Sequence, residues 1–454
     1  MSTVAAIATP CAASGIGIIR ISGEDALLIA DRVFSPFSSG TKLCDMKGYS
    51  AAYGRVFSEG KPLDEAVALV FRAPKSYTGE DVVELSCHGS PFVLSQVLRA
   101  VLSAGAQPAP AGEFTKRAYL NGKLDLARAE AVMNIIGSQG EDARCAALNA
   151  LDGALGKKTQ AVRSVIVSAA ANMSAWVDYP DEEIPELDRS TLAEAFSSCE
   201  NELRTLLSGF DAGQAVLSGV DTVIAGRPNA GKSTLMNLLA GRELSIVTPF
   251  AGTTRDIVEQ SVRVGNILLR LADTAGLRST EDEVEKIGVG RAFERVGRAG
   301  LVLAVFDSAE PLNADDMRLA QLCAGKKAVA VINKTDLPPR ADFEYIKAHF
   351  KYVAEISAFE DSGIDTLENA IEAVLGTENF DTSGALLTTE RQRMCCEKAA
   401  DCLNEAVDAL SSGMTLDAVN VSCDGAIAAL LELTGESVSE TVVNEVFAQF
   451  CVGK

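Results

Sequence analysis

The stretch Gly226-Arg-Pro-Asn-Ala-Gly-Lys-Ser233 decides the fold of the middle of this chain. It matches the pattern G-x-x-x-x-G-K-[ST], in which glycines let backbone N–H groups approach phosphate oxygens. The apolar run Val220–Ala225 before it predicts a strand, and Thr234–Ala240 predicts the following helix. A chance glycine-rich turn would lack this strand–loop–helix context. The stretch therefore predicts a parallel α/β domain that binds phosphate groups.

Two side chains of this loop have a defined chemistry toward a nucleoside triphosphate. Lys232 is expected to contact the β- and γ-phosphates and to act in catalysis, and the Ser233 hydroxyl is expected to ligate Mg²⁺. The nucleotide contacts expected here come from Asn229, Ala230, Gly231, Lys232, Ser233 and Thr234.

A second motif, Asp273-Thr-Ala-Gly276, follows the predicted strand Ile267–Ala272. An Asp at the end of a strand can hold Mg²⁺ through water, and the Gly276 amide can meet the γ-phosphate. A D-x-x-G pattern alone is weak evidence for a nucleotide site. Its position roughly 40 residues after Lys232 makes it strong evidence. The expected nucleotide contacts are Asp273, Thr274, Ala275 and Gly276.

Two further motifs predict the choice of base. Asn333-Lys-Thr-Asp336 follows the apolar run Ala328–Ile332, and the Asp336 carboxylate can accept hydrogen bonds from guanine N1–H and N2–H, which adenine does not offer. Ser357-Ala-Phe359 fits a loop whose Ala amide meets guanine O6, with Phe359 where Lys is common. We therefore expect GTP at Asn333, Lys334, Asp336, Ser357 and Ala358.

The stretch between the first two motifs contains Gly252-Thr-Thr254-Arg-Asp256, and Thr254 is the expected second protein ligand of Mg²⁺. Leu277 stands where Ras-type enzymes carry the Gln that orients the attacking water. Carboxylates between Ser279 and Glu285 could replace that Gln, although a solvated helix start explains any one of them as well.

Composition restricts the class of protein. The formal net charge of −21 excludes coating of nucleic acid by bulk electrostatics, because phosphate binding relies on Lys and Arg. The 11 cysteines contain no C-x-x-C pair, and scattered free thiols fit a reducing cytoplasm. The sequence contains no run of about 18 apolar residues, so we expect no membrane span. We read Val4–Ala8 as a first strand and not as a signal peptide.

The pattern of residues divides the chain into four segments of a multidomain α/β plus α protein. Residues 1–120 are strand-rich and predict an α+β domain. Residues 121–215 are helical, 216–377 alternate strand and helix, and 378–454 are helical again. The simplest account is a discontinuous helical domain interrupted by an inserted Ras-like GTPase domain.

Together with the phosphate loop, several blocks resemble the MnmE-type (TrmE) tRNA-modification GTPases over essentially the whole chain. These blocks are Gly17–Gly23, Tyr77–Leu85, Gly112–Ala118, Asn121–Leu126, Tyr179–Glu183 and the terminal Phe450-Cys-Val-Gly-Lys454. The terminal block is the most diagnostic, because ordinary GTPases do not end in this way. Cys11-Ala-Ala-Ser14 departs from the family, which usually has a Gly- and Arg-containing turn there.

The resemblance implies an N-terminal domain that dimerises and binds a 5-formyltetrahydrofolate-type folate through Arg20, Glu84, Lys123 and Lys454. It implies K⁺-stimulated dimerisation of the GTPase domains, with K⁺ held by Asn229, Thr248, Phe250 (through its backbone) and Thr253. Glu285 would orient the hydrolytic water, and Cys451 would lie near the modification site. The implied partners are tRNA, a second copy of the chain and an FAD-containing protein of the MnmG/GidA type, with no membrane.

The same residues can be interpreted without the family. Arg20, Glu84 and Lys123 are charges in apolar or turn segments, where intradomain ion pairs would satisfy them as well as a ligand would. Cys451 can be a buried thiol at a helix end, His88 a satisfied structural histidine and His349 a surface residue. The competing function is a GTPase switch or ribosome-assembly factor without covalent chemistry of its own.

Overall fold

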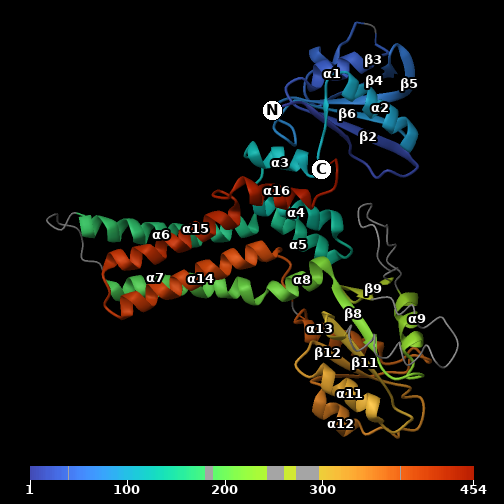
Figure 1. The fold of residues 1–454 in the computed structure, drawn as a ribbon, viewed down its shortest axis with the longest axis vertical. Helices are drawn as coiled ribbons and strands as arrows, with labels where there is room; N and C mark the ends of the chain where they lie inside the picture. Colours follow the sequence, from blue (N-terminus) through green and yellow to red (C-terminus); the bar gives the residue numbers. More distant parts are fainter. Residues whose placement is uncertain (39, 179–187, 243–259, 272–295, 379, 454) are drawn as a thin grey trace. The chain divides into compact units, whose positions relative to one another are not determined.

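The computed structural model describes residues 1–38, 40–178, 188–242, 260–271, 296–378 and 380–453. The chain forms two compact units, Met1–Met133 with Cys423–Lys454, and Asn134–Ser422. Figure 1 labels most of the elements of both. Within the described ranges, no helix combines the length and the apolar character that crossing a membrane requires.

The first unit contains a seven-stranded sheet in the order β3-β4-β5-β6-β2-β1-β7. Its strands are β1 (Val4–Ile7), β2 (Ser14–Ser22), β3 (Phe34–Pro36), β4 (Ser50–Ser58), β5 (Lys61–Phe71), β6 (Val82–Gly89) and β7 (Gln107–Pro108). Helices α1 (Ala26–Val33) and α2 (Pro91–Ser103) cover one face, and η1 (Leu43–Asp45) packs against α1. Because side chains alternate along a strand, Ile19 and Ile21 enter this core while Arg20 lies on the other face.

The C-terminal segment belongs to this first unit. Helix α16 (Glu440–Ala448) contacts α3 (Glu113–Leu120), and its Phe447 packs with residues at the start of α4 (Leu126–Gly137) in a small core. After α16 the chain returns to the strand domain, because Val452 forms an antiparallel bridge with Ala111. The last residues are thus fixed to a domain that begins more than 400 residues earlier.

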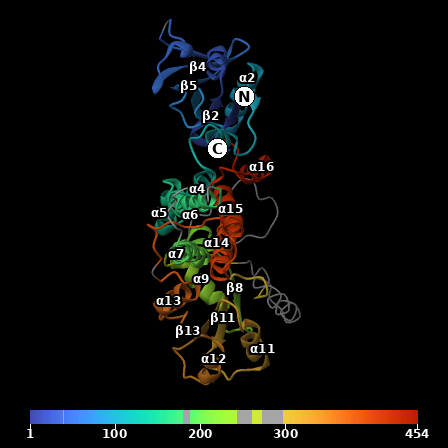
Figure 2. The same cartoon turned by 90° about the vertical axis from the view of Figure 1, so that its left-hand side faces the viewer.

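The helices of the second unit form a bundle. They are α5 (Glu141–Leu151), α6 (Ala154–Asp178), α7 (Arg189–Ser208), α8 (Phe210–Ser218) and α14 (Glu390–Ser411), while α15 (Leu416–Thr434) begins in this unit and ends in the first. Buried Phe196, Cys199 and Leu203 recur at helical spacing on α7 and face α14, which lies beside α7 in Figures 1 and 2. Segments before and after the α/β domain therefore form one helical domain, as the sequence predicts.

A two-residue turn separates the first two helices of this bundle. Only Asp152 and Gly153 separate α5 from α6, and Gly156 lies inside α6. Gly153 has a φ of +82°, which turns the chain where a residue with a side chain would be strained. Helix α16 begins after Ser439, which caps its first turn by accepting from the Val442 amide.

In its described residues, the inserted α/β domain has a six-stranded sheet in the order β13-β12-β11-β8-β10-β9. Its strands are β8 (Val220–Ala225), β9 (Gln260–Val264), β10 (Ile267–Leu271), β11 (Leu301–Asp307), β12 (Ala328–Asn333) and β13 (Tyr352–Glu355). Helices α9 (Lys232–Arg242) and α13 (Ile364–Leu375) share one core, and α11 (Ala314–Cys323) and α12 (Phe343–His349) share another. Figure 2 shows α13 and α11 on opposite sides of the sheet.

The expectation of a parallel domain holds for five of the six strands. Strand β9 pairs antiparallel with β10, because the two-residue turn Gly265-Asn266 joins them directly. Gly265 has a φ of +56°, the left-handed conformation that such hairpins require. The parallel strands β8, β11 and β12 end side by side, which gathers the loops that follow them at one edge of the sheet.

Candidate functional site

The phosphate loop leaves β8 and closes on itself. The Lys232 ammonium donates to the carbonyls of Gly226, at 2.9 Å, and Arg227, at 2.7 Å. A Cβ on Gly226 would lie 2.4 Å from the Val305 carbonyl oxygen, and Gly231 has a φ of +95°. Both glycines are therefore required by the backbone path. Helix α9 begins at Lys232, so its first N–H groups face the same loop.

Asn333 connects this loop to two others. Its Nδ2 donates to the Ala230 carbonyl at 2.9 Å, and its Oδ1 accepts from the Ala358 amide at 3.0 Å. The side chain is buried, so both bonds are shielded from water. The Ala358 amide, expected to meet guanine O6, thus already has a partner that a guanine oxygen would share.

The other residues expected to recognise guanine lie in the loops after β12 and β13. Asp336 is exposed, and its Oδ1 accepts from the Ser357 hydroxyl at 2.5 Å. Ser357 Oγ also accepts from the Glu360 amide at 3.2 Å, which fixes the hydroxyl proton toward Asp336. A carboxylate held at one oxygen leaves acceptor capacity for two parallel N–H donors, such as those of guanine.

Only some of the residues expected to bind Mg²⁺ and K⁺ lie in the described part of the chain. Ser233, Thr234 and Asn229 are exposed at the start of α9 and on the loop, and Asn229 has a φ of +61°. Asn tolerates that conformation better than most residues. The remaining expected residues lie outside the described part of the chain: Thr248, Phe250, Thr253, Thr254, Asp273, Thr274, Ala275, Gly276, Leu277, Glu285 and Lys454.

Two carboxylates near the loop went unnoticed in the sequence. The Arg227 guanidinium is 2.9 Å from Glu310 and 3.5 Å from Asp316. Burial raises the pKa of Asp316 above its usual range, against the lowering effect of Arg227. The acidic run that follows β11 was the available signal, but nothing local indicated that it would face the phosphate loop.

A second charged site forms in the first unit. Arg20 on β2 and Glu84 on β6 are register partners, and the guanidinium is 2.8 Å from the carboxylate. Arg20 Nη1 also donates to the Gly453 carbonyl at 3.2 Å. Its Cζ lies 5.4 Å from the ring centroid of Phe114 and 5.8 Å from that of Tyr77, within cation–π range. The structure thus brings Arg20, Glu84 and Gly453 together.

The other residues expected at this site are placed less directly. The Lys123 ammonium donates to the Pro74 carbonyl at 2.9 Å and is otherwise exposed. The stem of Lys123 lies near Gly79, where an added Cβ would be 3.6 Å from Lys123 Cγ. Cys451 is half-buried, and its carbonyl accepts from the Gly112 amide at 3.3 Å.

Arg117 supports the loop Tyr77–Asp81, although the sequence did not single it out. Its side chain is 3% exposed and pairs with Glu80 and Glu113, each at 2.9 Å. It also donates to the Ser2 carbonyl at 2.8 Å. A buried arginine paired with two carboxylates holds the segments that carry them in fixed positions. Its position in the block Gly112–Ala118 was the only sequence signal.

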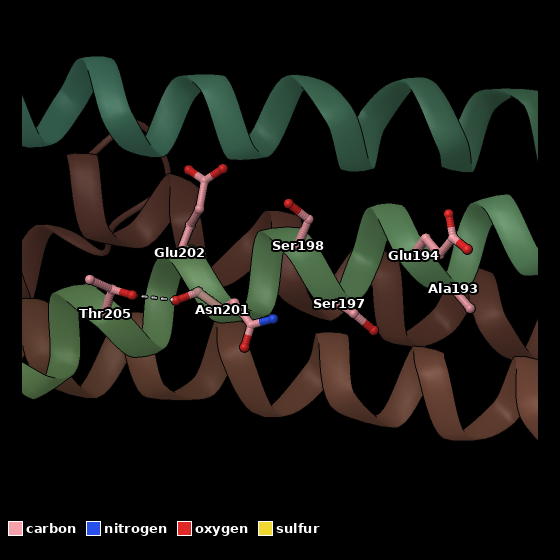
Figure 3. Close-up of a pocket in the computed structure, with 7 residues that line it drawn as sticks. All are labelled: Ala193, Glu194, Ser197, Ser198, Asn201, Glu202 and Thr205. Atoms are coloured by element: carbon pink, nitrogen blue, oxygen red, sulfur yellow. Dashed lines mark hydrogen bonds between the residues drawn. The ribbon is translucent and has the colours of Figure 1, made fainter.

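A shallow groove of 580 Å³ lies elsewhere, along α7. Figure 3 shows its lining side chains, all from this one helix: Ala193, Glu194, Ser197, Ser198, Asn201, Glu202 and Thr205. Glu202 is already ion-paired with Lys158 of α6 at 2.5 Å. Solvated acids and hydroxyls on one helix face do not make a ligand site.

Comparison with known proteins covers both units. The profile of the GTP-binding protein TrmE N-terminus matches residues 3–123, and that of the MnmE helical domain matches residues 126–451. Three proteins described as tRNA modification GTPase MnmE each cover 100% of this chain, with 99% of their own length aligned. They are 39% identical in Alkaliphilus metalliredigens, 41% in Symbiobacterium thermophilum and 40% in Geobacillus kaustophilus. A solved structure of Aquifex aeolicus Era with GDP.AlF4- is 25% identical over 40% of this chain and 66% of its own, at a TM-score of 0.27.

Proposed function

The chain belongs to the tRNA modification GTPase MnmE family, and from this premise we propose how its GTPase activity is used. GTP hydrolysis serves a formyl-tetrahydrofolate-dependent modification that places an aminomethyl-type group on C5 of the wobble uridine of tRNA. The chain acts as a homodimer with an FAD-containing partner of the MnmG/GidA type. This function needs a guanine-nucleotide site and a folate site.

The observation that carries the proposal is the convergence of three separate motifs on Asn333. The side chain of Asn333 bonds the phosphate loop at Ala230 and the loop of Ser357 and Ala358, and it precedes Lys334 and Asp336 in the same motif. Asp336 would accept from guanine N1–H and N2–H, while Lys232 would contact the β- and γ-phosphates. An adenine base offers Asp336 no pair of N1–H and N2–H donors, which favours GTP over ATP.

The described residues Ser233 and Asn229 support part of the proposed Mg²⁺ and K⁺ sites. Ser233 offers a hydroxyl and Asn229 a carboxamide, both hard oxygen donors of the kind that Mg²⁺ and K⁺ bind. Mg²⁺ would take Ser233 with Thr254, and K⁺ would take Asn229 with Thr248, Phe250 and Thr253. Bound K⁺ would supply positive charge for the phosphoryl oxygens during hydrolysis, the role that an arginine finger has elsewhere. Glu285 would hold the attacking water.

The folate would bind at Arg20, Glu84, Lys123 and Lys454. Arg20 and Glu84 offer one donor and one acceptor group beside the aromatic rings of Tyr77 and Phe114. That combination fits a flat heterocycle that has both N–H donors and ring acceptors. The nearby Gly453 carbonyl supports a role for the C-terminal segment, so that Cys451 would lie close to the bound folate.

The first experiment measures GTP turnover of the full chain in KCl and in NaCl. Asn229→Gly is the test variant, because glycine accepts the positive φ of this position while the carboxamide is removed. We expect several-fold faster turnover in KCl, and we expect Asn229→Gly and Glu285→Ala to abolish the difference. GDP affinity in Asn229→Gly is the control for an intact loop. Equal rates in both salts would refute the K⁺ assignment.

A binding measurement with 5-formyltetrahydrofolate separates the proposal from its alternative. Arg20→Met is expected to weaken folate binding by at least tenfold, because a charged hydrogen bond is lost and Glu84 stays unpaired. Arg32→Met, at the exposed end of α1, is the matched control. A chain that binds no folate would instead be a GTPase switch or a ribosome-assembly factor, a reading that the net charge of −21 disfavours for direct contact with rRNA.

A further inference from the structure

Asp307 lies between the phosphate loop (Gly226–Ser233) and the loop Asn333–Asp336, which is expected to bind guanine. It is the last residue of β11, which pairs with β8 on one side and with β12 on the other, and it is the register partner of Asn333. Its carboxylate is only 4% exposed. A carboxylate removed from water to this degree requires charged or hydrogen-bonding partners to be stable.

The first partner of Asp307 is Lys334. The Asp307 Oδ2 atom is 2.6 Å from the Lys334 ammonium, while Oδ1 accepts from the Ala309 amide at 2.9 Å. The next residue, Ser308, donates its hydroxyl to the Lys334 carbonyl at 2.7 Å. Lys334 has a φ of +66°, which is unfavourable for a lysine. Adjacent residues therefore hold this strained lysine by its side chain and by its backbone.

The second partner belongs to the phosphate loop. Arg227 Nη2 is 3.9 Å from Asp307 Oδ2, and the carbonyl of the same arginine accepts from the Lys232 ammonium at 2.7 Å. One buried carboxylate thus faces a cation from each of the two loops between which a nucleotide would extend. Glu310 pairs with Arg227 at 2.9 Å but is 65% exposed, and no contact with Lys334 is described for it.

We propose that Asp307 is a positioning residue for guanine-nucleotide binding. By holding the Lys334 ammonium, it keeps the methylene stem of this lysine in place as an apolar surface for the flat base. Through Arg227 it keeps the phosphate loop in register with that surface. Ordering both loops before the ligand arrives removes an entropic cost from binding. The inference rests on the proposed nucleotide site.

The experiment measures GDP affinity of the full chain by calorimetry, and KM and kcat for GTP. Asp307→Asn keeps the shape and removes the charge. We expect it to weaken GDP binding and to raise KM by about tenfold, with kcat changed by less than about threefold. Glu310→Gln is the matched control, which removes a carboxylate from the same arginine, and it is expected to stay within about twofold.

A second variant tests the route of the effect. Lys334→Met keeps the stem and removes the ammonium, on a side chain that is 31% exposed, so it serves even where Asp307→Asn fails to fold. We expect it to weaken GDP binding to a similar extent, and the double variant to lose little more than either single one. Independent, additive losses would overturn the proposal, as would unchanged or tighter GDP binding in Asp307→Asn. Asp336→Asn separates failure of the Asp307 proposal from failure of the nucleotide site on which it rests. Unchanged GDP affinity in Asp336→Asn would refute the nucleotide site itself.

Discussion

The side-chain amide of Asn333 donates to the carbonyl of Ala230 at 2.9 Å, and this bond joins two loops that are 103 residues apart in the chain. The same side chain accepts from the Ala358 amide, so that one buried carboxamide satisfies groups in the loop of Ala230 and in the loop of Ala358. Nothing else described in the structure bonds Asn333 Nδ2 or Oδ1. The geometry of the proposed nucleotide site therefore depends on this residue.

Asn333→Ala is expected to lower the free energy of unfolding by about 1–3 kcal/mol, because two buried groups lose their partners. GDP affinity should fall at least tenfold, since the phosphate and base loops are no longer held together. Chemical denaturation and calorimetry measure the two effects. Asn404→Ala, on the exposed face of α14, is the control and should change neither quantity.

Gly231→Ala tests the closeness of the same two loops. An added Cβ would lie 2.1 Å from Asn333 Nδ2, at a backbone φ of +95°. We expect a loss of roughly 1–3 kcal/mol in unfolding free energy and no measurable GDP binding. Gly241→Ala is the counterpart in open space on α9, where alanine favours the helix by about 1 kcal/mol. Normal nucleotide binding in Gly231→Ala would contradict the described loop path.

Gly453→Ala tests the proposed contribution of the C-terminal segment to folate binding. Its Cβ would lie 2.4 Å from the Ile7 carbonyl oxygen, so the segment carrying the Gly453 carbonyl must move away from Arg20. We expect at least tenfold weaker binding of 5-formyltetrahydrofolate and GTP turnover within twofold of the unchanged chain. Gly413→Ala also changes a glycine of positive φ, but it meets no atom within 4 Å and should retain folate binding.

His88 predicts a pH dependence in the first unit. The structure places this histidine on the surface of β6, with its Nδ1 2.6 Å from Asp64. The hydrogen bond to Asp64 raises the pKa of His88 above its usual value of about 6.5. The ion pair of His88 with Asp64 therefore stabilises the folded chain fully at a pH below the pKa of His88 in the unfolded chain. This stabilisation is lost as the pH rises through the higher pKa of His88 in the folded chain.

NMR titration of the two histidines checks this expectation, and His349→Gln assigns the signals. Asp64→Asn should return the pKa of His88 toward its usual value. The difference in unfolding free energy between Asp64→Asn and the unchanged chain should shrink as the pH rises past neutrality. A pKa of His88 that is the same in both proteins would show that the ion pair does not form in solution.

Local patterns predicted most elements of the fold, because those elements depend on neighbouring residues. The apolar runs of β8, β11 and β12 and the helical spacing in α7 and α14 appear in the sequence and in the structure. The antiparallel edge strand β9 was missed. The signal for it was the short turn Gly265-Asn266, which is weaker than the parallel pattern of the domain around it.

The candidate sites were predicted in part for the same reason. The phosphate loop and Asn333-Lys-Thr-Asp336 are contiguous motifs, so their residues could be named from the sequence. Arg20 and Glu84 could be named through the family but not paired, and Arg227, Asp307 and Arg117 could not be assigned a role. Arg20 and Glu84 are 64 residues apart in the chain, and Arg227 and Asp307 are 80 residues apart.

The sequence by itself determined the nucleotide motifs, the elements that carry them, the family and the interruption of one helical domain by another fold, because each of these is recorded in contiguous residues. Tertiary structure alone decided which distant side chains meet. It pairs Arg20 with Glu84 through the register of β2 and β6, and it places Asp307 between Lys334 and Arg227 through the order of three parallel strands. The reason is physical, since strand order and register are set by the burial of a whole sheet and not by any short segment.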